Sequence, residues 1–272
     1  MNNNKMLNYI KDVLQNMPTG WLNLTTHRLD IYNEKLAKTE FLDQFENLYK
    51  NNNADATALN QLPTAYDYIR LGHPLSCALE WVIADLNNLK PEAVISFSSK
   101  TTPILSVLRK NLLDNKKTQI NFVGQLPSIF DADILRTVYG YNFELNQVNS
   151  AEDISSFHGS TIFINQQDGI CHATLNNNID FTVNLHTELG SVLLVNGEHN
   201  ASYISDIQHV RRRETIAMTP VNCLAALNDL INDTTSDYTS STLQSDKTKV
   251  LATIKEITGS PSKPLVGSSG LS

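Results

Sequence analysis

Apolar residues recur at helical spacing through the first 60 residues of the chain. Leu7, Ile10 and Leu14 share one face of a first predicted helix, and residues 31–49 form a second. The run Pro18-Thr19-Gly20 between them is typical of a turn. We therefore predict a helical arm over residues 1–60.

The pattern changes between residues 61 and 231, where short apolar runs alternate with amphipathic segments. The short runs predict buried strands and the longer segments predict helices. This alternation indicates an α/β fold in which a mostly parallel sheet is flanked by helices. Helical segments are scarce between Ile162 and Val195, so antiparallel strands or a hairpin are expected there. The predicted strands are 93–97, 120–123, 143–145, 161–164, 180–183 and 191–195, and the predicted helices are 75–87, 103–113, 130–139, 201–214 and 221–231.

Residues 232–272 differ in composition from the rest of the chain. Asn232–Asp246 is rich in Ser and Thr and almost free of large apolar side chains, which is typical of a flexible linker. One short helix is expected at Val250–Ile257. The Gly-, Ser- and Pro-rich end is expected to be a disordered tail.

Composition and charge argue against several classes of function. The 272-residue chain has a formal net charge of −7, whereas proteins that bind duplex nucleic acid usually present a basic face. Its three cysteines lack the spacing of a zinc site, so no metal is expected. The first residues do not form an apolar signal sequence, and no segment has the length of a membrane span. We expect a cytoplasmic protein that binds neither nucleic acid nor membrane.

Two motifs stand close together in Tyr66–Leu108. Tyr68 and Arg70 form a Tyr-x-Arg ahead of an apolar helix that carries Leu79-Glu80, and Ser98-Ser99 opens the helix after the next strand. This order resembles the pyridoxal-phosphate enzymes of cysteine and methionine metabolism, the cystathionine synthase and lyase group. In those enzymes a Ser-Gly-Met turn binds the cofactor phosphate, and the Tyr-x-Arg reaches into the site of the partner subunit.

A second stretch, Gly190–Leu230, resembles the part of the same family that follows its cofactor lysine. Together the two stretches imply an aminotransferase-like large domain, a homodimer with active sites built from two subunits, and an N-terminal arm that can wrap the partner. The resemblance also implies cofactor-binding roles for Tyr68, Arg70, Ser98, Ser99, Lys100 and Thr101.

The chain differs from the family at the positions that carry the family's chemistry. Lys100 and Thr101 replace the Gly and Met of the phosphate-binding turn, although a lysine can still meet a phosphate as a point charge. Glu188 falls on the position of the cofactor lysine, in a stretch where Asp180 and Thr187 match the family. No lysine occurs between Lys117 and Lys247, and an aldimine requires a primary amine. The aspartate that would pair with the pyridine nitrogen has no clear match, and the family's smaller C-terminal domain is expected to be missing.

The resemblance therefore implies the fold without the chemistry. We expect a degenerate, non-catalytic relative that acts as a dimeric scaffold or partner protein and binds pyridoxal phosphate only if that binding has been retained. One alternative is a lysine-independent enzyme or binder of an anionic metabolite, phosphorylated or carboxylated. It would use His186 and Glu188 as an acid–base pair on one face of a strand, with Arg70 and Lys100 on the substrate. Another alternative is a generic α/β protein that binds a partner through residues 1–60.

The remaining polar motifs have ordinary interpretations. Arg211, Arg212 and Arg213 are consecutive, so on a helix they spread around the axis and predict a solvated face with salt bridges. Cys171 and His172 are neighbours whose side chains would diverge on a strand, so a catalytic dyad is not expected there. Tyr68 and Arg70 are also compatible with a simple turn before a helix.

Overall fold

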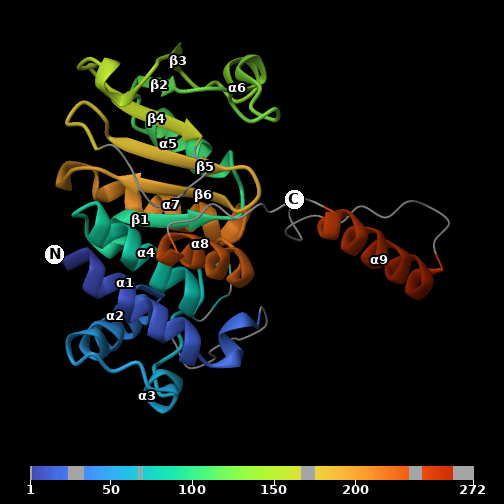
Figure 1. Ribbon diagram of the computed structural model, residues 1–272. Helices are drawn as coiled ribbons and strands as arrows, with labels where there is room; N and C mark the ends of the chain where they lie inside the picture. Colours follow the sequence, from blue (N-terminus) through green and yellow to red (C-terminus); the bar gives the residue numbers. More distant parts are fainter. Residues whose placement is uncertain are drawn as a thin grey trace.

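The computed structural model describes residues 2–23, 34–66, 68, 70–166, 175–232 and 241–259. Within these residues a six-stranded sheet forms the centre, in the order β1-β6-β5-β4-β2-β3 (Figure 1). β6 is antiparallel to both of its neighbours, whereas the β2–β3, β2–β4 and β4–β5 pairs are parallel. The strands are β1 (Val94–Phe97), β2 (Thr118–Phe122), β3 (Phe143–Gln147), β4 (Ser160–Gln166), β5 (Phe181–His186) and β6 (Gly190–Val195).

Helices α4 and α6 begin at residues whose side chains cap them. His73 caps α4 and Pro74 occupies its first turn, where a missing N–H costs nothing. The carboxylate of Asp131 accepts a hydrogen bond from the amide of Ile134 at the start of α6. The helices are α1 (Asn2–Asn16), α2 (Glu34–Lys50), α3 (Ala56–Asn60), α4 (Pro74–Leu86), α5 (Thr102–Leu113), α6 (Ala132–Thr137), α7 (Ser202–Glu214), α8 (Pro220–Asn232) and α9 (Ser241–Thr258).

The two faces of the sheet are covered differently. Ile95, Ile162 and Leu193 belong to one face and pack with residues of α5 and α7 in a single apolar cluster. On the other face, α4 and α8 join Val94 and Val192 of β1 and β6 in a second cluster. The strand pattern therefore gives a sheet with helices on both faces, as the sequence predicts.

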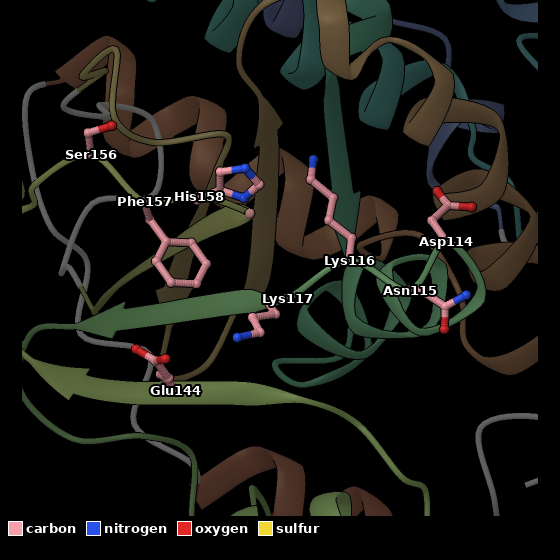
Figure 2. Close-up of a pocket in the computed structure, with 9 residues that line it drawn as sticks. Asp114, Asn115, Lys116, Lys117, Glu144, Ser156, Phe157 and His158 are labelled. Atoms are coloured by element: carbon pink, nitrogen blue, oxygen red, sulfur yellow. The ribbon is translucent and has the colours of Figure 1, made fainter.

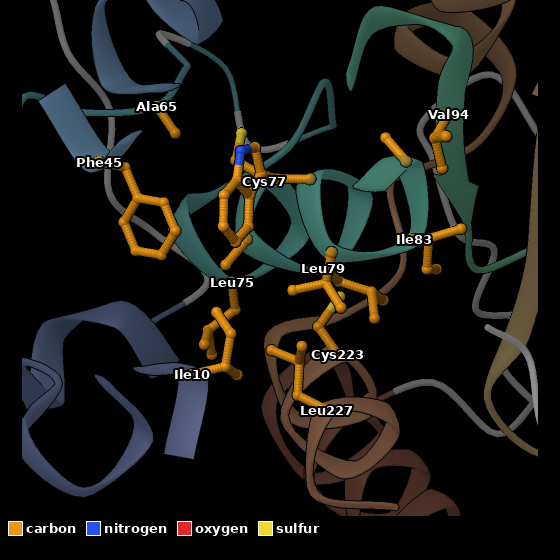
Figure 3. Packing of buried hydrophobic residues seen from close by; sticks show 14 of the residues in the cluster. Ile10, Phe45, Ala65, Leu75, Cys77, Leu79, Ile83, Val94, Cys223 and Leu227 are labelled. Atoms are coloured by element: carbon orange, nitrogen blue, oxygen red, sulfur yellow. The ribbon is translucent and has the colours of Figure 1, made fainter. Parts of the chain in front are cut away.

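The N-terminal arm packs on its own chain. Ile10 of α1 and Phe45 of α2 lie in the same cluster as Leu75 of α4 and Leu227 of α8, around the central helix α4 (Figure 3). The apolar stripe that predicts the arm is thus buried within the chain. In the part of the arm that the structure describes, the polar side chains Lys5, Lys11 and Asp12 of α1 remain exposed.

A buried ionic cluster ties four elements together. Glu80 of α4 is 0% exposed, and its carboxylate accepts hydrogen bonds from Lys38 Nζ of α2 at 2.7 Å and Arg211 Nη1 of α7 at 2.8 Å. The amide and hydroxyl of Ser96 in β1 also donate to it. Burial by itself would raise the pKa of Glu80, but the charges of Lys38 and Arg211 outweigh burial and hold that pKa below its usual value.

The expectation of a solvated arginine face is wrong for Arg211. Its guanidinium is fully buried beside Glu80, whereas Arg213 is exposed. The consecutive arginines do spread around the helix axis, but one of them points inward because a carboxylate in the core needs a cation.

Most predicted strands and helices are confirmed, including a β5–β6 hairpin in the region where helices are scarce. Helix α6 is shorter than predicted, since Asp131 caps it late and Gly140 follows with a φ of 71°. α9 begins at Ser241, inside the predicted linker, because a polar segment without Gly or Pro can satisfy its backbone hydrogen bonds within a helix. The rest of the predicted linker and tail, residues 233–240 and 260–272, lies outside the described residues. None of the described helices is long and apolar enough to span a membrane.

Candidate functional site at the carboxyl edge of the sheet

In the segment after β1, a serine hydroxyl binds the backbone amides at the start of α5. Ser99 Oγ accepts hydrogen bonds from the amides of Thr101 and Thr102, at 3.3 and 3.1 Å, and from Thr102 Oγ1 at 2.8 Å. Pro103, the next residue of α5, has no N–H. An anion at a helix N-terminus is held by free amides, so the first turn of α5 has few donors left for a phosphate.

The turn after β5 is closed by a histidine. His186 is 7% exposed, and its Nδ1 accepts hydrogen bonds from the amides of Glu188 and Leu189, each at 3.1 Å. β5 ends at His186, so Glu188 lies in the turn and not two places along the same strand. The predicted acid–base pair on one strand face is therefore wrong in its geometry, because the chain turns one residue after His186.

The segment after β1 contacts the turn between β5 and β6. Lys100 Nζ donates to the carbonyl oxygen of Thr187 at 3.2 Å, and Ser191 Oγ donates to the carbonyl oxygen of Ser99 at 2.6 Å. Gly190, with a φ of 120°, approaches so closely that an added Cβ would lie 2.2 Å from the carbonyl oxygen of Phe97. Close backbone approach joins β1 and β6 at this end of the sheet.

Asp180 lies at the opposite edge, one residue before β5. Its carboxylate accepts hydrogen bonds from Thr161 N at 2.8 Å and Asn200 Nδ2 at 2.8 Å, and contacts His199 Nε2 at 3.1 Å. A strand of six residues extends for roughly 20 Å, so Asp180 takes no part in the edge that holds Glu188. The stretch matched to the family's lysine region is therefore divided between the two edges.

Tyr68 and Arg70 lie beside the segment that follows α7. The guanidinium groups of Arg70 and Arg212 lie against the ring of Tyr68, at 5.6 and 5.5 Å from its centroid. Ala217 N donates to the carbonyl oxygen of Arg70 at 2.8 Å, and Ser98 N donates to that of Ile216 at 3.2 Å. These contacts place Tyr68 and Arg70 next to the segment after β1 that begins at Ser98. Arg212, which the sequence pattern assigned to a solvated face, lies beside them.

Pyridoxal phosphate does not fit this arrangement well. Glu188 offers a carboxylate where the family has an amine, and Ser99 already occupies two amides of the phosphate-binding turn. The hydroxyl of Ser98 is directed to Ile216 O at 3.3 Å. Lys100 lies in the segment matched to the phosphate-binding turn, and its Nζ donates to the backbone carbonyl of Thr187.

A pocket of about 900 Å³ lies at the opposite, amino edge of the sheet (Figure 2). It is formed by the loops that precede β2 and β4, together with Glu144 of β3. The lining mixes Lys116 and Lys117 with Asp114 and Glu144, so its charge selects no single class of ligand. No sequence motif predicts this pocket, because the loops that form it are far apart in the chain.

The other polar motifs add no site among the described residues. No group of three His, Cys, Asp or Glu side chains there is arranged to hold a metal ion. Cys77 and Cys223 are both buried. Cys171 and His172 lie outside the described residues.

Comparisons with known proteins give a likeness of fold. No family model matches the chain, and no curated protein matches it. Among solved structures, cystathionine gamma-lyase from yeast is similar at 11% identity and a TM-score of 0.48, over 82% of this chain and 62% of that one. Cystathionine gamma-lyase from Lactobacillus plantarum, complexed with L-serine, is similar at 13% identity and a TM-score of 0.43, over 82% and 63%. MetB from Corynebacterium glutamicum is similar at 14% identity and a TM-score of 0.40, over 64% and 55%.

These names belong to the group that the sequence resembles. The chain spans less than two thirds of the length of each of these structures. Because every TM-score is below 0.5, the function of this chain has to be argued from its own residues.

Proposed function

We propose that the chain is a degenerate, non-catalytic relative of the pyridoxal-phosphate-dependent sulfur amino-acid enzymes and acts as a scaffold, as a homodimer or as the partner of another chain. The observation that carries the proposal is the turn after β5. There a carboxylate, Glu188, stands in place of an amine, and the buried ring of His186 is committed to two backbone amides. A turn held in this way has a structural role, since Nδ1 of His186 already accepts hydrogen bonds from two backbone amides.

The first turn of α5 supports the same proposal. A phosphate would have to displace Ser99 Oγ from the amides of Thr101 and Thr102. It would gain no replacement donor from Pro103. The site thus lacks an amine at position 188 and lacks free backbone amides that could bind a phosphate.

The test is to mix the protein with pyridoxal phosphate, follow the absorbance of the aldimine and reduce with borohydride before mapping peptides by mass. We expect no adduct on a lysine of the described core. Glu188→Lys restores an amine but does not free the amides of Thr101 and Thr102 for a phosphate, so we expect this variant to form no specific adduct either. A stoichiometric adduct on Lys100 that Lys100→Arg abolishes would contradict the proposal.

A second candidate function is binding of an anionic metabolite without a lysine nucleophile. It is favoured by the two guanidinium groups of Arg70 and Arg212 on Tyr68, close to Ser98 at the same edge. A cation pair of this kind in a chain with net charge −7 is a local attraction for phosphate or carboxylate. The probe is inorganic phosphate or a phosphorylated metabolite in a thermal-shift titration. Stabilisation that Arg70→Ala removes supports this function, and stabilisation that survives Arg70→Ala contradicts it.

The third interpretation, a generic α/β protein that binds through residues 1–60, is the least favoured. Met6, Ile10 and Val13 are fully buried within the chain. These side chains of α1 are therefore already covered by the chain itself and are not available to a partner.

A further inference from the structure

We propose that β3 of one chain pairs with β3 of a second copy of the chain, so that the two sheets join edge to edge around a twofold axis. Among the described strands, β3 stands last in the sheet and pairs only with β2 (Figure 1). An edge strand presents backbone N–H and C=O groups that another strand can bind. Such pairing is one form of the homodimer proposed above and rests on that proposal.

The backbone groups of β3 divide between β2 and the outside of the sheet. Asn142 O accepts a hydrogen bond from Thr118 N at 3.3 Å, and Val148 N donates to Phe122 O at 3.0 Å. In a parallel pair, the residues whose backbone groups bind the neighbouring strand alternate along the chain. The residues of β3 whose backbone groups point outward are therefore Phe143, Leu145 and Gln147.

Most of these outward groups have no partner in the part of the chain that the structure describes. Phe143 O accepts a hydrogen bond from Arg136 Nη2 at 3.3 Å. The backbone N–H and C=O groups of Leu145 and Gln147 make no hydrogen bond to any described residue on that side. Leu145 is half-buried and Gln147 is exposed, so a second strand can reach this edge.

The opposite edge strand, β1, is closed by other parts of its own chain. Ser96 N donates to Glu80 Oε1 at 2.9 Å, and Ser96 O accepts from Arg211 Nη1 at 2.9 Å. Beyond the end of the strand, Ser98 N donates to Ile216 O at 3.2 Å. The chain thus satisfies outward backbone groups along β1, whereas those of β3 require another strand.

The order of side chains along β3 favours a second copy of the same strand. In an antiparallel pairing centred on Leu145, every outward N–H and C=O group of one strand meets a complementary group of the other. Glu144 then lies opposite Asn146 of the second copy, whose amide can donate to the carboxylate. A centre at Glu144 would oppose two carboxylates and leave Gln147 unpaired, and a centre at Asn146 would leave Phe143 unpaired. The strand is therefore complementary to itself in one register.

The experiment measures the mass of the full chain by light scattering after size exclusion, over a range of concentrations. We expect a dimer of the 30.3 kDa chain. Asn146→Glu opposes two carboxylates at both ends of the pairing, so it should raise the dissociation constant about tenfold. Adding Glu144→Lys to Asn146→Glu places a lysine opposite each glutamate and restores the dimer. Asn146→Gln is the neutral control and leaves the dimer intact.

A proline tests the backbone contacts. Gln147→Pro removes an outward N–H but no hydrogen bond to β2, since proline is tolerated on an edge strand in this orientation. Gln147→Ala is the matched control, because it also loses the side-chain hydrogen bond to Gly124 O but keeps the N–H. We expect Gln147→Pro to be a monomer and Gln147→Ala to be a dimer.

Three results would overturn the proposal: a full chain that is monomeric at every concentration, a dimer unaffected by Asn146→Glu and Gln147→Pro, or a double variant that Glu144→Lys does not restore. Mass reports on the pairing of β3, whereas the aldimine absorbance reports on the missing amine chemistry. Either of the two proposals can therefore fail without the other.

Discussion

Two glutamates show how differently this chain uses its charged residues. Glu80 is 0% exposed and is paired with Lys38 and Arg211. Glu188 is half-buried in a turn that hydrogen bonds from backbone amides to His186 hold closed. In the Glu80 cluster, charged side chains hold the structure. At the carboxyl edge the ring of His186 and two backbone amides hold the turn, and the side chain of Glu188 takes no part in those bonds.

The largest effect is expected from breaking the Glu80 cluster. Glu80→Ala leaves two buried cations without their partner, which costs about 3–5 kcal/mol in the free energy of unfolding. Chemical denaturation measures this loss. Glu198→Ala is the control, because its exposed pair with Lys90 contributes at most about 1 kcal/mol. A loss for Glu80→Ala no larger than that of the control would remove the distinction between the two regions.

The next largest effect is a pH dependence of the free energy of unfolding that comes from His73, the N-cap of α4, about two turns before Glu80. Its Nδ1 accepts from Ser76 N at 3.2 Å and its Nε2 lies 2.7 Å from Met218 O, so the neutral ring satisfies both contacts. Burial lowers the pKa of His73 to about 4 from 6.5.

The unfolded chain therefore binds a proton near pH 6.5 that the folded chain does not accept until about pH 4. The stabilisation is complete above pH 6.5 and decreases as the pH falls towards 4. Between pH 7 and 5 we expect a loss of about 2 kcal/mol. Denaturation of His73→Asn over the same range is the comparison, since Asn can cap the helix without titrating. An equal slope in both proteins would assign the effect to another group.

The backbone of the carboxyl edge is tested by Gly190→Ala. The new Cβ would lie 2.2 Å from Phe97 O at a φ of 120°, and such overpacking costs about 1–3 kcal/mol. Gly20→Ala is the matched control, because nothing lies within 4 Å of its added Cβ. Equal midpoints of thermal unfolding for the two variants would show that β1 and β6 can separate there without cost.

The smallest effect is expected from Glu188→Gln at the same edge. The hydrogen bonds of that turn come from the backbone, so the free energy of unfolding should change by about 0.5 kcal/mol or less. Chemical denaturation at neutral pH measures the change. A loss comparable to that of Glu80→Ala would mean that the side chain of Glu188 has a structural role that its contacts do not reveal.

The sequence could predict the strands because their apolar runs depend on local pattern alone. The hairpin of β5 and β6 followed from the lack of a helix between two strands. The pairing of Glu80 with Arg211 could not be predicted, because 131 residues separate them and a charge in an apolar helix reveals a need for a partner but not its identity.

For the candidate site, the sequence pattern supplied the segments but not their contacts. Lys100 meets Thr187 because β1 and β5 run in the same direction and their carboxyl ends lie at one edge of the sheet. The role of His186 in closing the turn was not predicted. Placing His186 and Glu188 on one strand face assumes that the strand continues past His186, and β5 ends there. The change of direction arises from hydrogen bonds to the ring, which no periodicity encodes.

The pairing of β1 with β6 has a consequence for synthesis of the chain. Val94 pairs with Leu194, so β1 must wait for about 100 further residues to be translated, roughly 5–20 s at ordinary ribosomal rates. During that interval the nascent helices around α4 have no completed sheet to rest on. We therefore expect chaperones to bind the partly synthesised chain on the ribosome, before β6 has emerged.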